Sequence, residues 1–117
     1  MHYIDGFVAA VPDAQRETYI RYAAEIAERL KQYGALRVVE CWGDDVPEGQ
    51  LTSFQMAVKR DPGESVVFAW IVWPDKATRD AAHPKMAADP LAQPETNPMP
   101  FDGKRLIYGG FQMVLDA

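Results

Sequence analysis

The chain has little cysteine, few basic residues and no long apolar run, and each shortage excludes a class of protein. Its 117 residues include one cysteine, Cys41, which excludes an internal disulfide and favours a reducing compartment. The longest strongly apolar run, Val66 to Trp73, has eight residues, far fewer than the ~20 that span a bilayer. The first residues lack the basic-then-apolar order of a secretory signal. We therefore expect a cytoplasmic protein with no membrane partner.

Basic residues are also too few and too scattered for nucleic acid. The chain has 12 Lys and Arg against 17 Asp and Glu, a formal charge of −5. Its tightest basic groups are the pairs Lys59-Arg60 and Lys104-Arg105, each close to acidic residues. Phosphate backbones are held mainly by clustered Lys and Arg. Nucleic acid is therefore not an expected partner.

Short motifs for phosphate, dinucleotide or zinc binding are absent as well. The sequence has no Gly-Lys-Ser/Thr loop, no G-x-G-x-x-G, no C-x-x-C and no H-E-x-x-H. Asp80 and His83 have the spacing of two ligands on one helix face, but two ligands do not make a metal site. We therefore expect no metal and no cofactor.

The composition itself is that of one globular domain covering residues 1–117. Apolar residues make up 48% and charged residues 25% of the chain, which are average values for such domains. A chain of this length buries roughly 65% of its extended surface, enough for a single core.

Alternation, helical spacing and turn residues predict the order of the elements. Residues 3–11 alternate as in a strand that Pro12 ends. Apolar residues then recur at helical spacing up to Gly34, which ends helices readily. Further strands are predicted at 36–42, resuming at 54–58 after an excursion at 43–52, and at 66–73 and 104–115.

A second helix is predicted from Asp75, a plausible N-cap, with a kink or break at Pro84. The stretch from 84 to 100 holds five prolines, and its part from 89 to 100 is expected to be a long ordered loop or flap. Gly109 and Gly110 indicate a bulge or a close backbone approach in the last strand.

The order of elements predicts an α+β fold of the ferredoxin-like βαββαβ type, with a four-stranded antiparallel sheet. Two helices can cover only one face of such a sheet. The other face also carries large apolar side chains, which are a liability unless a second copy covers them. We therefore predict a symmetric homodimer.

Several strings of the sequence resemble the YbaA-like family of small uncharacterised bacterial proteins. They are Gly34 to Trp42 (GALRVVECW), Asp45 to Pro47 (DVP), Phe54 to Lys59 (FQMAVK) and Met99 to Phe111 (MPFDGKRLIYGGF). The resemblance covers nearly the whole chain and implies the dimeric α/β-barrel superfamily, in which two ferredoxin-like subunits press their sheets together. It implies no reaction, because the family is a domain of unknown function. Similar proteins carry a polar pair in place of His83-Pro84, so the second helix is expected to end earlier here.

Two carboxylates inside apolar strands, Asp5 and Glu40, are the candidate catalytic residues. A desolvated carboxylate has a raised pKa and can act as a general acid or base. Alternatively, each pairs with Arg37 or Arg105 and holds the sheet or the dimer together, and this structural interpretation is favoured. Cys41 lies beside Glu40 and is expected to be a buried, inert thiol.

Aromatic residues of the last two strands are the candidate walls of a ligand pocket. By resemblance to cofactor-independent quinol monooxygenases of the superfamily, a cavity is expected between the sheet and the dimer partner, with the 89–100 loop as its lid. Packing of these rings in the core is the favoured alternative, and the proline-rich stretch keeps the pocket open as a hypothesis. The residues concerned are Phe68, Trp70, Trp73, Tyr108 and Phe111.

Two hypotheses follow. In the first, the protein is a homodimeric small-molecule binding or sensing domain whose ligand contacts Trp70, Tyr108, Arg105 and Arg79. In the second, it is a cofactor-independent monooxygenase-like or isomerase-like enzyme, with Glu40 or Asp5 as base and Arg105 or Arg79 stabilising an oxyanion. A carboxylate that faces a cavity without an arginine partner favours catalysis, whereas a satisfied ion pair favours structure or binding.

Overall fold

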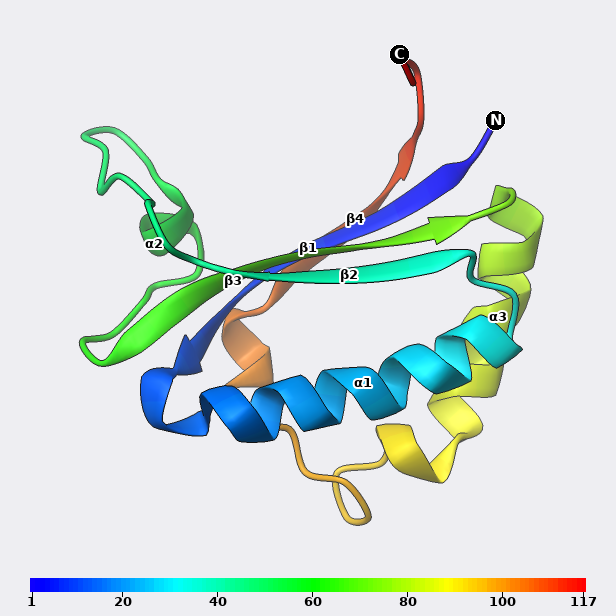
Figure 1. The fold of residues 1–117 in the computed structure, drawn as a ribbon, viewed down its shortest axis with the longest axis horizontal. Coiled ribbons are helices and arrows are strands. Elements are labelled where there is room, and N and C mark those ends of the chain that lie inside the picture. Colours follow the sequence, from blue (N-terminus) through cyan, green and yellow to red (C-terminus); the bar gives the residue numbers. More distant parts are fainter.

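The computed structural model describes residues 1–117 as an open sheet with its long helices on one side (Figure 1). The sheet has four strands in the order β2-β3-β1-β4, and every neighbouring pair is antiparallel. The strands are β1 (Tyr3–Pro12), β2 (Arg37–Trp42), β3 (Glu64–Trp73) and β4 (Ile107–Gln112). The helices are α1 (Arg16–Gln32), α2 (Phe54–Ala57) and α3 (Lys76–Ala88), with 3-10 turns at Asp13–Gln15, Pro90–Ala92 and Gly103–Arg105. The expected α+β class with four antiparallel strands is confirmed.

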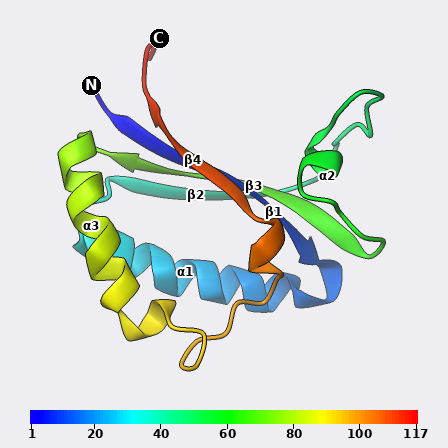
Figure 2. The same cartoon turned by 180° about the vertical axis from the view of Figure 1, so that it is seen from behind.

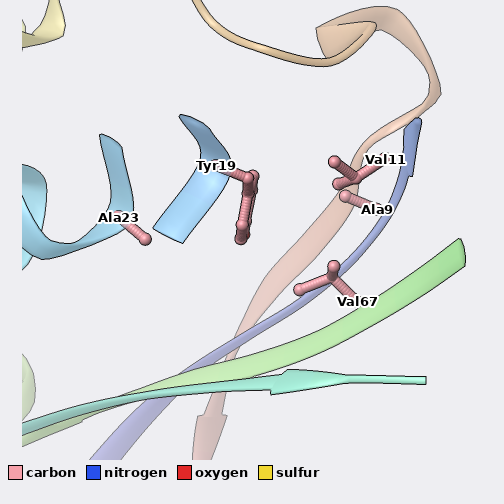
Figure 3. Close-up of a cluster of buried hydrophobic side chains, with 5 residues drawn as sticks. All are labelled: Ala9, Val11, Tyr19, Ala23 and Val67. Atoms are coloured by element: carbon pink, nitrogen blue, oxygen red, sulfur yellow. The ribbon is translucent and has the colours of Figure 1, made fainter. Parts of the chain in front are cut away.

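Helix α1 forms as its apolar spacing predicts and packs along the sheet. Tyr19 and Ala23 point from α1 toward Ala9, Val11 and Val67 of the central strands (Figure 3). Gly34 has φ of 115° just after the helix, in the left-handed region that glycine adopts at low cost. The main core therefore lies between α1 and one face of β1 and β3.

The proline-rich stretch 89–100 lies on the helix side of the molecule. Both ribbon views place it below α1 and far from the opposite face of the sheet (Figures 1 and 2). The buried carboxylate of Asp89 anchors its start by accepting hydrogen bonds from the Tyr33 hydroxyl at 2.6 Å and from the Leu91 N–H at 3.0 Å. These hydrogen bonds lower the pKa of Asp89. Apart from the 3-10 turn, the stretch is an ordered loop, as expected.

The predicted strand at 54–58 is wrong. Residues 54–57 form the short helix α2, which Ser53 caps by accepting a hydrogen bond from the Met56 N–H at 3.0 Å. Of the alternating residues Phe54, Met56 and Val58, only Val58, just after the helix, is buried, and Phe54 and Met56 are exposed. Val58 is fully buried against Val8 and Val66, so tertiary packing outweighs the local strand pattern.

The predicted break at Pro84 is also wrong, because α3 continues through it to Ala88. A proline inside a helix removes one backbone hydrogen bond. Here the helix is fixed before Pro84: Asp75 caps its start by accepting from the Thr78 N–H at 2.7 Å, and Ala82 is fully buried.

The last strand is shorter than predicted, spanning Ile107–Gln112 instead of 104–115. Residues 103–105 form a 3-10 turn, because Asp102 accepts a hydrogen bond from the Lys104 N–H at 3.0 Å and draws the chain out of extended conformation. Strand β4 pairs with β1 in unbroken register, so Gly109 and Gly110 form no bulge. A Cβ at Gly110 would instead meet the Tyr3 hydroxyl at 2.5 Å and the Arg79 Nη2 at 2.8 Å, which is the expected close approach.

Candidate functional site

Successive residues of each strand belong to two different faces of the sheet. In β1, Ala9 packs against α1, whereas Val8 and Ala10 pack against Val58, in the excursion that carries α2. We call these the helix face and the open face. Each face borders a hollow large enough for a small molecule.

The open face carries a hollow of about 590 Å³ whose walls are almost wholly apolar. The large side chains around it remain exposed, including Phe68, Ile107 and Phe111. The Phe111 ring lies beside Gly6 and Gly109, where added Cβ atoms would come within 3.6 Å of it. No Asp, Glu, Lys, Arg or His side chain lines this hollow, which consists of Ile4, Gly6, Phe7, Val8, Phe68, Ala69, Trp70, Ile107, Tyr108, Gly109 and Phe111.

The helix face borders a second hollow of about 350 Å³, which we call the inner cavity. Helix α1, residues of α3 and the segment before β4 enclose it against the sheet. Its walls are mostly apolar and aromatic but include two carboxylates, Asp5 and Glu40, and one imidazole, His83. The remaining lining residues are Gly6, Phe7, Tyr19, Tyr22, Ala23, Ile26, Ile71, Met99, Phe101, Leu106 and Tyr108.

Asp5 is held in a satisfied ion pair. Its Oδ1 accepts from Arg79 Nη2 at 2.8 Å, and its Oδ2 accepts from Trp73 Nε1 at 2.9 Å. The Asp5 and Arg79 side chains are about one-seventh exposed. The carboxylate raises the pKa of Arg79 further above its ordinary value. Asp5 is therefore fixed by donors on two sides, and its partner is Arg79 and neither Arg37 nor Arg105.

Glu40 lacks any such cation. Its Oε1 accepts a hydrogen bond from the Tyr19 hydroxyl at 2.6 Å, and its Oε2 makes no hydrogen bond within the chain. Part of the residue is exposed at the β2 edge of the sheet, but the protein atoms around its carboxyl group raise the pKa of Glu40. Burial also raises the pKa of the Tyr19 hydroxyl, so Tyr19 stays a donor. Glu40 therefore combines a raised pKa with a carboxylate oxygen that has no donor, whereas both oxygens of Asp5 accept hydrogen bonds.

The two candidate oxyanion-binding arginines do not lie together. Arg79 lies behind Asp5 and also donates to Asp80 at 3.1 Å. Arg105 donates to both Glu64 carboxylate oxygens at 2.7 and 2.8 Å, which lowers the pKa of Glu64. Neither arginine lines the inner cavity.

His83 enters the inner cavity from α3, one turn after Arg79. Its Nε2 lies 3.6 Å from Asp5 Oδ2, and half of its side chain is exposed. It extends the Asp5–Arg79 pair toward solvent. No group of three or more His, Cys, Asp or Glu side chains is arranged to hold a metal ion.

Comparison with known proteins gives the chain a family. The family described as "Protein of unknown function (DUF1428)" matches residues 2–103. The chain is also 53% identical over 116 residues to "Uncharacterized protein YbaA" of Escherichia coli K12 and to that of Shigella flexneri, covering 99% of each protein. The chain belongs to this DUF1428 family. The resemblance seen in its strings is thereby confirmed.

The candidate aromatic residues of this DUF1428 member are divided between the two faces. Phe68, Trp70 and Phe111 lie on the open face, whereas Trp73 is fully buried on the helix face. Tyr108 lies on edge strand β4, opposite Phe7, and is largely exposed. No single pocket holds the whole expected set.

Cys41 differs from its predicted state, because it is exposed rather than buried. It lies opposite Phe68 in the β2–β3 pairing, so it belongs to the open face. A free cysteine is usually buried, but here β2 is the edge strand and nothing in the chain covers it.

Sequence reasoning missed the contribution of α1 and of the segment before β4 to the inner cavity. The helical spacing assigns Tyr19 and Tyr22 to one apolar face and predicts no role for their hydroxyl groups. Met99 lies in the proline-rich stretch 89–100 and Phe101 directly follows it, and no local sequence pattern predicts where that stretch lies in the fold. The Tyr19–Glu40 pair joins residues 21 positions apart, so only the fold brings it together.

None of the helices is long and apolar enough to cross a membrane.

Proposed function

We propose that the protein is a cytoplasmic homodimer of ferredoxin-like subunits, packed as a dimeric α/β barrel, that binds or senses a small molecule in the inner cavity. The observation that carries the ligand site is Glu40, a carboxylate on the cavity wall whose only hydrogen-bond partner is Tyr19.

The strand order supports the ferredoxin-like fold. Order β2-β3-β1-β4 with every pair antiparallel is what two βαβ units produce when their sheets interleave. In this arrangement α1 and α3 follow β1 and β3, and both ribbon views show them on the same side of the sheet (Figures 1 and 2).

The composition of the open face supports the homodimer. An exposed apolar surface of this kind marks an interaction site on a protein that must stay dispersed in water. A second copy is the fitting occupant, because a two-fold axis pairs the patch with itself and needs no complementary charge. The lining of the open hollow offers no charge for a charged partner to match.

The two hollows differ in the chemical groups that they can recognise, and this difference supports a ligand site on the helix face. Ligand sites combine apolar walls with a few polar groups that fix orientation. The hollow of the open face has no acidic, basic or histidine side chain, whereas the inner cavity has Glu40 and His83 on apolar walls. Its volume of about 350 Å³ is near the lower end of the ~300–1,000 Å³ range of small-molecule sites.

Light scattering tests the dimer. We expect twice the 13.1 kDa mass of one chain at micromolar concentration. A mass of 13.1 kDa would contradict the dimer and would leave the inner cavity, which one chain builds alone, as a separate question.

Nuclear magnetic resonance with a neutral aromatic probe, 1-naphthalenemethanol, tests the ligand site. The Trp73 indole N–H donates to Asp5, which lines the inner cavity, so its signal should shift on binding. The Trp70 indole, on the open face, is the internal control and should not move. A shift confined to Trp70 would contradict the inner cavity as the ligand site.

An enzyme of the isomerase-like type is the second candidate, because Glu40 meets the condition set for catalysis: it faces a cavity with no arginine partner. It would take a proton from one carbon of the bound substrate and return it to another, so atoms and charge balance without a cofactor. Turnover of a carbonyl substrate, lost in Glu40→Gln and kept in Asp5→Asn, would support this function. Binding of such a substrate without its conversion to the isomer would contradict it.

A further inference from the structure

Carboxylates outnumber cationic side chains in the lining of the inner cavity. Two carboxylates, Asp5 and Glu40, line it, and no lysine or arginine does. The positive charge of Arg79 is already shared between Asp5 and Asp80. Asp5 is therefore neutralised within the protein, and the remaining negative charge belongs to Glu40.

Arg16, which lines a neighbouring hollow together with Glu40, has other partners. Arg16 lies with its guanidinium carbon 5.5 Å from the centre of the Trp42 ring and pairs with Glu17 at 3.7 Å. It lines the neighbouring hollow between α1 and β2 and does not bond to Glu40. Glu40 Oε2 is thus an acceptor with no donor from the chain.

An anion placed beside this carboxylate would lose its water and gain no counter-charge, which is costly. A donor group would instead complete the hydrogen bonding of Glu40, and such bonds to charged acceptors are stronger than neutral ones. The rest of the wall, including Tyr22 and Phe101, suits an aromatic ring and, through ring faces, a cation.

Resting on the proposed function, we propose that the inner cavity binds a small aromatic molecule whose amino or hydroxyl group donates a hydrogen bond to Glu40, and that it rejects aromatic anions. This assigns a ligand class to the cavity and makes Glu40 the group that selects it.

Three probes with the same ring and different charge test the ligand class: 1-naphthylmethylamine, 1-naphthalenemethanol and 1-naphthoate. Titration calorimetry gives their affinities, and the indole signals of Trp73 and Trp70 give their site. We expect the amine to bind most tightly, the alcohol more weakly and the carboxylate at least about tenfold more weakly than the amine.

The variant Glu40→Gln removes the negative charge but keeps the size of the side chain. A glutamine carbonyl can still accept a hydrogen bond from the Tyr19 hydroxyl. We expect it to lose about tenfold or more in affinity for the amine, to change little toward the alcohol and to bind the carboxylate better. Glu25→Gln, the same change on an exposed residue of α1, is the matched control and should leave all three affinities unchanged.

The outcomes distinguish this inference from the proposed function. Equal binding of all three probes, with Trp73 shifted, would overturn the ligand class and leave the cavity as a binding site. Unchanged amine affinity in Glu40→Gln would overturn the role of Glu40 alone. Binding of none of the probes, or shifts at Trp70 only, would overturn both.

Discussion

The two faces of the sheet are built from the same four strands, yet their side chains differ in polarity. On the helix face, charged side chains such as Asp5 and Glu40 lie among apolar ones, and each has a hydrogen-bond donor. On the open face, the neighbours of those residues, such as Gly6 and Val39, are apolar. A strand's period of two lets adjacent residues serve separate functions. The open face therefore suits an apolar partner, whereas the helix face can hold a polar ligand.

The largest expected effect is on the dimer, from a charge placed on the open face. Trp70→Glu should raise the dissociation constant of the proposed dimer at least about 100-fold, because each subunit would bury a carboxylate without a partner in the interface. Sedimentation equilibrium measures it.

Ile20→Glu makes a similar change on an exposed residue of α1 and should leave the dimer intact. If both variants stay dimeric, the open face is not the interface.

The next effect concerns the anchored carboxylate of the helix face. Arg79→Met should lower the free energy of unfolding by about 2 kcal/mol, because it leaves Asp5 mostly buried without its cation. Urea unfolding at one fixed protein concentration measures it, since the stability of a dimer depends on concentration.

Arg21→Met is the control, because the guanidinium of Arg21 contacts only Thr18, at 3.5 Å, on the surface. The double variant Arg79→Met/Asp5→Asn should regain much of the loss. A double variant no better than Arg79→Met would show that the ion pair is not the cause.

The reaction rate of the exposed Cys41 thiol distinguishes the proposed dimer from a monomer. In the proposed dimer the open face is covered, so reaction of Cys41 with a thiol reagent such as DTNB should be at least about tenfold slower than in monomeric Trp70→Glu, because local exposure controls the rate. The absorbance of the dye that the reaction releases measures this rate. Equal rates in the two proteins would place β2 outside the interface.

The smallest effect, opposite in sign to that of Arg79→Met, is expected at Glu40. Because its folded-state pKa is raised, the wild-type protein should lose stability as the pH rises from the ordinary glutamate value of about 4.3 through the raised value. Glu40→Gln removes that loss and should be more stable at pH 7 by about 0.5 kcal/mol or less.

At pH 4 the two proteins should have the same midpoint in thermal unfolding, since Glu40 is then largely protonated in both states. A variant less stable than wild type at pH 7 would show that the charge of Glu40 stabilises the fold, as in an ordinary ion pair.

The sequence predicts those features whose signals are local. The helical spacing from Tyr19 to Leu30 and Gly34 locate α1, and the alternation around Phe7 locates β1. The strand expected at 54–58 is wrong, because the Ser53 cap starts a short helix there and only Val58 of the three alternating apolar residues is buried. Pro84 was expected to end α3, but the cost of one hydrogen bond is smaller than the packing of that helix.

The candidate site was predictable only in part, for the same reason. Asp5 and Glu40 stand out as carboxylates inside apolar strands. Their partners, Arg79 and Tyr19, lie 74 and 21 positions away, and no periodicity links them. Which carboxylate is neutralised and which is left with a free acceptor is decided by how α1 and α3 cross the sheet.

The excursion that carries α2 leaves the sheet and returns to it at neighbouring points. The Gly43 N–H donates to Val66 O at 2.7 Å, and the Asp13 N–H donates to Gly63 O at 2.8 Å, so both ends are tied to the ladder. Leu51, in the part of the excursion before α2, is 98% exposed. A fluorophore or an affinity peptide inserted beside Leu51 would therefore extend an already closed protrusion, and it would provide a way to immobilise the protein with its inner cavity still facing the solution.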